Sequence, residues 1–225
     1  MSEQTRSDVT IPVEGGSLPA VRQGPADASD VPALVVVPSI FGAAEDLIER
    51  LGELGEEALV VVPDPFWRTG EGAVPYDDVD TAFGRLTEFD MGACGAEMAA
   101  AAEWARDEGN GTVIGLGICF GGPFVLRLAA KDLLDGLVTW HGSRMEQSLD
   151  RVADIACPVR HHLGSADPIT PPETIEALRE AFADHDDAQI IVHEGATHGF
   201  SHDGDAFDPV AYRAGFESVR GLLFS

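Results

Sequence analysis

Lysine is almost absent from this chain, in which Lys131 is the only one among 225 residues. Lysine and arginine together number 14 against 39 aspartates and glutamates, which gives a formal net charge of −25. A surface of this sign repels nucleic acids and anionic membranes, so we expect neither as a partner. The acidic residues are spread along the whole chain, and this pattern is typical of a halophilic protein.

Cysteine and long apolar runs are scarce as well. The three cysteines, Cys94, Cys119 and Cys157, lie far apart and form no C-x-x-C pair, which indicates neither a disulfide framework nor a zinc site. No apolar run approaches the length of a membrane span. The first eight residues are polar and contain no segment of signal-peptide type, so we expect a cytoplasmic protein.

Apolar strands and helical patterns alternate along the sequence. The runs Ala33–Pro38 and Ala58–Pro63 are continuously apolar, as in strands buried on both faces. Further strands are expected at Ser7–Pro12, Leu18–Gln23, Thr112–Leu116, Gly136–Trp140, Val159–Leu163 and Gln189–His193, and helices at Ala43–Gly55, Asp77–Phe89, Ala93–Glu108, Pro123–Ala130, Pro172–Ala183 and Pro209–Phe224. This succession predicts an α/β fold with a mainly parallel sheet flanked by helices on both faces, formed by residues 1–225 as a single domain.

Residues 117–122, with the sequence GICFGG, carry the clearest functional signal. Strand, glycine-flanked turn and helix in this order are typical of a nucleophile elbow, here with Cys119 in place of the usual serine. The glycines make room for a strained turn, and the N-terminus of the following helix favours a thiolate. The alternative is a buried cysteine in an ordinary glycine-rich turn.

An elbow nucleophile needs an acid and then a histidine, each at the carboxyl end of its own strand. Asp167 lies in the segment GSADP just after the predicted strand Val159–Leu163, and His198 lies in GATHGF after Gln189–His193. Taken singly, Asp167 fits ordinary turn chemistry and His198 a solvated loop. Because all three occur in the expected order, we predict a catalytic triad of Cys119, Asp167 and His198.

The chemistry assigns each member a task. His198 would take the thiol proton and later protonate the leaving group, while Asp167 would accept the other imidazole N–H and fix the tautomer. The oxyanion needs two backbone N–H donors. We expect them from Phe120, which follows the nucleophile, and from Ile40, in the turn after the Ala33–Pro38 strand.

A metal site is the competing use of the histidines. His193, His198 and His202 have a suggestive spacing, but the glycines between and after them make a single helical face improbable, so we expect no metal and no cofactor. His141 ends a predicted strand at the same sheet edge. We expect it to line the substrate pocket with Phe41 and Phe200, core packing being the alternative.

These motifs resemble the dienelactone hydrolase (carboxymethylenebutenolidase-like) family of the α/β-hydrolase fold. The resemblance extends from about Ala33 to the C-terminus and rests on residues 40–42 (IFG), 62–64 (VPD), 89–91 (FDM), 117–122, 164–167 and 197–200 (THGF). It implies Cys119 as the nucleophile with Asp167 and His198 as its partners, an ester or lactone substrate, no cofactor and a monomer.

Two features of that family are missing. Its typical members have a glutamate that contacts the resting thiol, at the position where this chain has Ser39. The two arginines that hold the substrate carboxylate fall near Val79 and at His202, and Arg85 is not in register to replace one. Without a bidentate guanidinium clamp a dicarboxylate lactone loses its main anchor. We expect Ser39 and His202 to lie in the substrate pocket.

The sequence therefore predicts a hydrolase that cleaves a small activated ester or lactone through a thioester acyl-enzyme. A related carboxylesterase or thioesterase with a different acyl specificity is the second interpretation. A non-catalytic binding protein that has retained the fold is the third.

The excess of acidic residues leads to a prediction about salt. High salt screens the repulsion among surface charges, so the melting temperature should rise between low salt and molar KCl. Thermal melts across a KCl series measure this. A melting temperature that is equal at the two ends of the series would contradict the halophilic interpretation.

Overall fold

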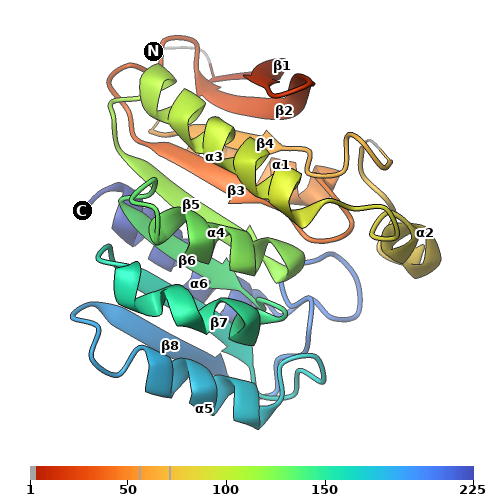
Figure 1. The fold of residues 1–225 in the computed structure, drawn as a ribbon, viewed down its shortest axis with the longest axis vertical. Coiled ribbons are helices and arrows are strands. Elements are labelled where there is room, and N and C mark those ends of the chain that lie inside the picture. The colour runs from red at the N-terminus through yellow and green to blue at the C-terminus, as the bar shows by residue number, and fades with distance from the viewer. Residues whose placement is uncertain (1–3, 56, 71) are drawn as a thin grey trace.

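A single mixed sheet forms the centre of the structure, a computed structural model that describes residues 4–55, 57–70 and 72–225 (Figure 1). Within these residues the sheet has eight strands in the order β1-β2-β4-β3-β5-β6-β7-β8. β1 pairs with β2 and β2 with β4 in antiparallel fashion, and every other neighbouring pair is parallel. The strands are β1 (Gln4–Val13), β2 (Gly16–Pro25), β3 (Ala33–Val37), β4 (Leu59–Pro63), β5 (Val113–Ile118), β6 (Gly136–Trp140), β7 (Val159–Gly164) and β8 (Ala188–His193).

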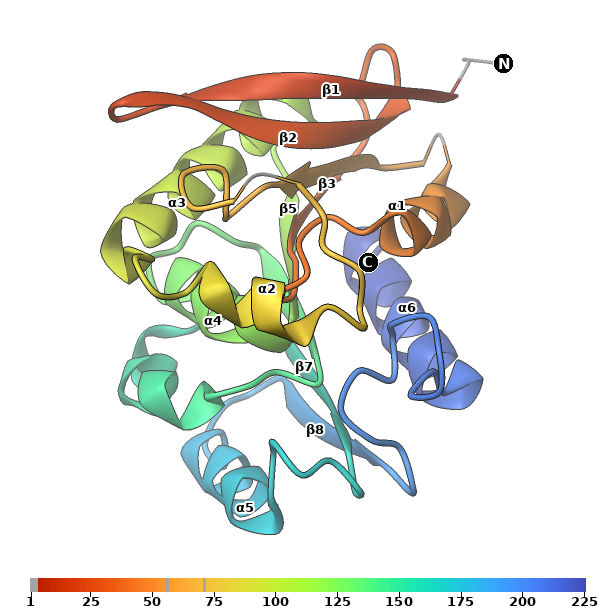
Figure 2. The same cartoon turned by 90° about the vertical axis from the view of Figure 1, so that its right-hand side faces the viewer.

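Helices cover both faces of this sheet, which confirms the predicted α/β fold. On one face lie α3 (Met91–Glu108), α4 (Gly122–Ala129) and α5 (Pro172–Ala181), and on the other α1 (Glu45–Leu51) and α6 (Pro209–Leu223) (Figure 2). The shorter elements are α2 (Val79–Gly84) and the 3₁₀ helices η1 (Gly52–Leu54), η2 (Cys119–Gly121) and η3 (Met145–Asp154). No helix in the described part of the chain has both the length and the apolar character needed to cross a membrane.

The apolar strands account for the two layers of the core. Successive side chains of a strand point to opposite faces of its sheet. Accordingly Ala33, Val35 and Val37 of β3 pack into the core under α3, α4 and α5, whereas Leu34 and Val36 pack into the core under α1 and α6. Both faces of β3 are therefore buried, as its continuous apolar sequence predicts.

Some helices differ from the sequence expectation. The helix expected at Asp77–Phe89 is limited to α2, which the Asp78 carboxylate caps by accepting the Thr81 N–H and which ends at Gly84, a residue of low helix propensity. The helix expected at Ala43–Gly55 is shortened to α1 and continues as η1. η3 lies in a segment for which the sequence predicts no element.

The order of the strands prepares one edge for a site. The parallel strands β3, β5, β6, β7 and β8 are successive neighbours, and β5 has β3 on one side and β6 on the other. Their carboxyl ends therefore meet along one edge, where ligands bind in open parallel sheets.

Candidate active site

Cys119 stands on a strained turn directly after β5. Its backbone has a φ of +50°, which residues with a side chain rarely adopt. The flanking glycines are a steric necessity, because a Cβ at Gly121 would lie 1.9 Å from the carbonyl oxygen of Val37, and one at Gly117 would lie 2.7 Å from that of Gly121. The turn predicted from the sequence is thus present, with η2 beginning at Cys119 itself and α4 at Gly122.

The loops after β7 and β8 bring Asp167 and His198 to this turn. His198 Nε2 lies 3.1 Å from Cys119 Sγ, and His198 Nδ1 lies 2.8 Å from Asp167 Oδ2. The other carboxylate oxygen, Oδ1, accepts the backbone N–H groups of Ile169 and Thr170. The structure therefore brings the three predicted residues together in one hydrogen-bonded chain, whose catalytic role stays a prediction.

Two opposing influences set the protonation of His198. Burial lowers the pKa of this imidazole, but the hydrogen bonds with Asp167 and Cys119 and the charges of these two groups outweigh burial and raise the pKa to about 9. The Asp167 side chain has no exposed surface, so its carboxylate is poorly screened by water. At neutral pH His198 therefore carries both ring protons, one directed at Asp167 and one at the sulfur.

The predicted oxyanion donors lie on the two segments expected. Phe120 is in the first turn of η2, where a backbone N–H has no partner within the helix. Ile40 lies in the turn after β3, and its N–H donates to no other described group. Ser39 is buried in the same turn, and its Oγ accepts the Phe41 N–H at 3.3 Å. Ser39 thus supports the turn and has no hydrogen bond with Cys119 among the described residues.

Two serines that the sequence does not single out, Ser143 and Ser201, contact Cys119 and His141. Ser143 Oγ lies 3.7 Å from Cys119 Sγ, within reach of a weak hydrogen bond, and Ser143 N–H donates to the Cys119 carbonyl. His141 is fully buried, with a φ of +38°, and its Nε2 lies 2.8 Å from Ser201 Oγ. Burial holds the pKa of His141 well below its usual value, so its ring is neutral. No sequence pattern marks either serine.

The remaining residues predicted to line the substrate pocket, Phe41, Phe200 and His202, make contacts between aromatic rings. Phe41 packs edge-on against Tyr76 and His202, whose rings stack on each other at 4.5 Å. Burial lowers the pKa of His202 to about 4, so this ring is neutral as well. Phe200 has no exposed surface and packs edge-on against His141. The assignment of these side chains to a substrate pocket stays a prediction.

The positions of the missing arginines are occupied by uncharged groups. Val79 is 44% exposed on α2, and His202 is neutral at neutral pH. Arg85 is nearly buried. Its Nη2 donates to the carbonyl of Gly72, and its guanidinium lies over the ring of Phe66 at 4.8 Å. The Arg85 guanidinium is therefore held by Gly72 and Phe66.

Other histidines serve the packing of the sheet. His161 Nδ1 lies 2.7 Å from Thr139 Oγ1, and His162 Nδ1 lies 2.9 Å from His193 Nε2. Burial lowers the pKa of His161 and of His162 to about 3 each and also lowers that of His193. His193 is thus paired with His162 and does not join His198 and His202. Instead, Cys119 Sγ and one ring nitrogen each of His141 and His198 lie within 4.8 Å of one another.

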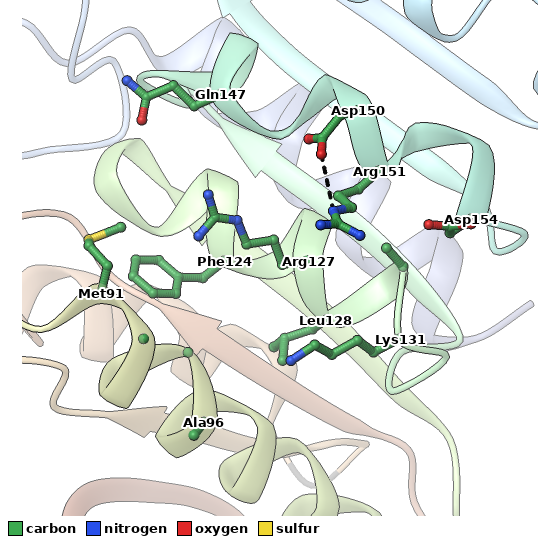
Figure 3. Close-up of a pocket in the computed structure, with 13 residues that line it drawn as sticks. Met91, Ala96, Phe124, Arg127, Leu128, Lys131, Gln147, Asp150, Arg151 and Asp154 are labelled. Atoms are coloured by element: carbon green, nitrogen blue, oxygen red, sulfur yellow. Dashed lines mark ion pairs between the residues drawn. The ribbon is translucent and has the colours of Figure 1, made fainter.

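A separate cleft lies between α3, α4 and η3 (Figure 3). Its volume is about 430 Å³, and Phe124, Arg127, Lys131 and Arg151 are among its lining residues. Arg151 is paired with Asp150 at 3.2 Å. None of the described residues that line this cleft is a cysteine or a histidine. The chemistry that the sequence predicts therefore belongs to the elbow and not to this cleft.

Comparison with known proteins shows which family and which chains this protein is similar to. The model of the dienelactone hydrolase family matches residues 18–220. Carboxymethylenebutenolidase from Pseudomonas putida is 29% identical over 218 residues, covering 94% of this chain and 92% of that protein. Carboxymethylenebutenolidase 1 from Cupriavidus pinatubonensis is 29% identical over 167 residues, 71% of each chain. The crystal structure of a candidate dienelactone hydrolase from Klebsiella pneumoniae superposes with a TM-score of 0.84, at 25% identity and 98% coverage of both chains.

The close approach of Gly121 to β3 leads to a prediction. Gly121→Ala places a methyl group against the Val37 carbonyl, so we expect a loss of about 1–3 kcal/mol in the free energy of unfolding. Urea denaturation measures it. The control is Gly95→Ala in α3, where the added Cβ meets nothing within 4 Å beyond the adjoining backbone of its own helix and better helix propensity should stabilise by up to about 1 kcal/mol. Equal effects of the two substitutions would contradict the steric role of Gly121.

Proposed function

The chain belongs to the dienelactone hydrolase family and is a hydrolase acting on esters or lactones, and on this premise we propose that it cleaves a small activated ester or lactone through Cys119, His198 and Asp167. The observation that carries the proposal is the continuous hydrogen-bonded chain from the Asp167 carboxylate through His198 to the Cys119 sulfur. Such a chain is the arrangement that nucleophilic acyl transfer requires.

The nucleophile of the proposed reaction is the Cys119 thiolate, paired with the His198 imidazolium. His198 is a full positive charge 3.1 Å from the sulfur at neutral pH, because its pKa is raised to about 9. Asp167 holds that charge from the other side. His198 therefore supplies the positive charge that stabilises the thiolate. Ser39 has no charge, and its hydroxyl is engaged with the Phe41 N–H in its own turn.

The reaction then proceeds in two steps. The thiolate attacks the carbonyl carbon, a C–S bond forms, and the N–H groups of Ile40 and Phe120 bind the oxyanion. When the intermediate collapses, the C–O bond breaks, and His198 Nε2–H protonates the departing oxygen to leave a thioester on Cys119. His198, now neutral, takes a proton from water, whose oxygen attacks the thioester. The C–S bond then breaks with the thiolate as leaving group, which releases the carboxylic acid and restores the pair of thiolate and imidazolium.

The substrate of this enzyme differs from a dicarboxylate lactone. A carboxylate at the far end of the substrate would meet Val79 or the neutral ring of His202 in place of a guanidinium fork. The aromatic walls formed by Phe41, Tyr76 and His202 suit an uncharged, flat group. We therefore assign the site to an ester or lactone whose acyl part needs no carboxylate anchor.

The nucleophile can be tested by labelling and turnover. Iodoacetamide should modify one thiol stoichiometrically, and Cys119→Ala should abolish this labelling while Cys157→Ala, which removes the half-buried cysteine, should retain it. Hydrolysis of p-nitrophenyl acetate should be lost in Cys119→Ala and His198→Ala. A labelled thiol without turnover on any activated ester or lactone would contradict the enzyme proposal and favour a binding protein.

The leaving group supplies a second prediction. A thiolate leaves the tetrahedral intermediate more easily than a simple alkoxide does, so the forward step requires a good leaving group. We expect turnover of p-nitrophenyl acetate to exceed that of ethyl acetate by orders of magnitude, measured as kcat/KM at high salt. Comparable rates on the two esters would contradict a thioester mechanism.

A further inference from the structure

The cluster of Cys119, His141 and His198 has a composition that suits a metal ion. Its sulfur and two ring nitrogens come from the segments that follow β5, β6 and β8, and they lie within 4.8 Å of one another. Thiolate and imidazole together favour Zn²⁺ and similar borderline-soft cations. Ligand atoms of one tetrahedral zinc, at about 2.3 Å for sulfur and about 2.0–2.1 Å for nitrogen, lie roughly 3.5 Å apart. Side-chain shifts of about 1 Å would thus complete the site.

Both histidines already have the supporting contacts that metal ligands require. A ligating histidine almost always engages its second ring nitrogen with a carboxylate, a carbonyl or another polar group, which fixes the ring. His198 does so with Asp167 through Nδ1, which leaves Nε2 directed at the sulfur. His141 does so with Ser201 through Nε2, which leaves Nδ1 as its remaining ligand atom.

His141 also has an unexplained buried atom. The residue has no exposed surface, and its Nδ1 has no hydrogen-bond partner among the described residues. A buried polar atom without a partner costs free energy that an apolar side chain of similar size would avoid. Acyl transfer by Cys119, His198 and Asp167 uses no nitrogen of His141. A ligand for that nitrogen accounts for a polar side chain at this position.

We propose that Cys119, His141 and His198 form a three-ligand site for Zn²⁺, with the fourth coordination position open to water. The thiolate and His198 Nε2 are the atoms that acyl transfer needs, so a bound Zn²⁺ is a reversible inhibitor of the hydrolase. His193 and His202, which the sequence spacing would group with His198, are not ligands, because His193 is paired with His162 and His202 is stacked on Tyr76.

Co²⁺ is the probe for this site because zinc has no useful absorption. Titration of the full chain should give one equivalent of bound Co²⁺ with a thiolate-to-cobalt charge-transfer band, displaced by Zn²⁺. The band should vanish in Cys119→Ser, and Co²⁺ affinity should fall at least tenfold in His141→Gln. His193→Gln is the matched control, a neighbouring histidine outside the cluster, and should bind as the native chain does.

If His141→Gln fails to fold, a substitution of the residue that contacts His141 provides an independent test. Ser201→Ala removes only the partner of His141 Nε2 and should weaken Co²⁺ binding by about 10–100-fold, the usual effect of losing such a contact. The absence of a charge-transfer band, or equal affinity in His141→Gln and the native chain, would overturn the proposal. Binding by the acidic surface alone would produce no such band and would also count against it.

The consequence for activity is measured separately. Zn²⁺ should abolish hydrolysis of p-nitrophenyl acetate, and a chelator should restore it. If the chain hydrolyses no ester, the proposed function fails while the cobalt titration still decides on the metal site. Undiminished hydrolysis when Zn²⁺ saturates the cobalt-binding site would contradict inhibition.

Discussion

The contact between the elbow and the end of β3 is the constraint on which the rest of the site depends. The carbonyl oxygen of Val37 occupies the place where a side chain of residue 121 would be, so the backbone of η2 lies directly against β3. At this separation the chain turns sharply, with a positive φ at Cys119, and the sulfur leaves the buried strand for the sheet edge. Phe120 directly precedes Gly121, and Ile40 lies in the turn that follows Val37. The positions of Cys119 and of the two predicted oxyanion donors therefore depend on one packing contact.

The electrostatics of the site are concentrated in His198. The pKa of His198 is raised, whereas burial lowers the pKa of His141 and of His202 and leaves these two rings neutral. A single positive charge between a buried carboxylate and a sulfur atom is a compact way to stabilise a thiolate. It also means that the sulfur loses its only charged partner among the described residues whenever His198 gives up its proton. Ser39 and Ser143 are neutral and cannot replace that charge.

The succession of strands and helices, the elbow and the loops of Asp167 and His198 could be predicted, because each leaves a local signal in the sequence. A buried run or a glycine-rich turn is such a signal. Ser143 and Ser201 could not be predicted, since their contacts with Cys119 and His141 arise only when loops after β6 and β8 fold over the elbow. The full burial of His141 agrees with the core packing that the sequence left open as the alternative to a pocket position. The catalytic roles, the monomeric state and the single-domain organisation stay predictions.

The buried histidines also determine how the molecule responds to acid and base. Five of the seven histidines, His141, His161, His162, His193 and His202, have a lowered pKa, and that of His198 is raised to about 9. Few side chains are then left to take up or release protons near neutrality. The large negative charge of the protein therefore changes little as the pH drifts near neutrality. In that range the repulsion within the folded chain depends more on the ionic strength of the solvent than on its pH.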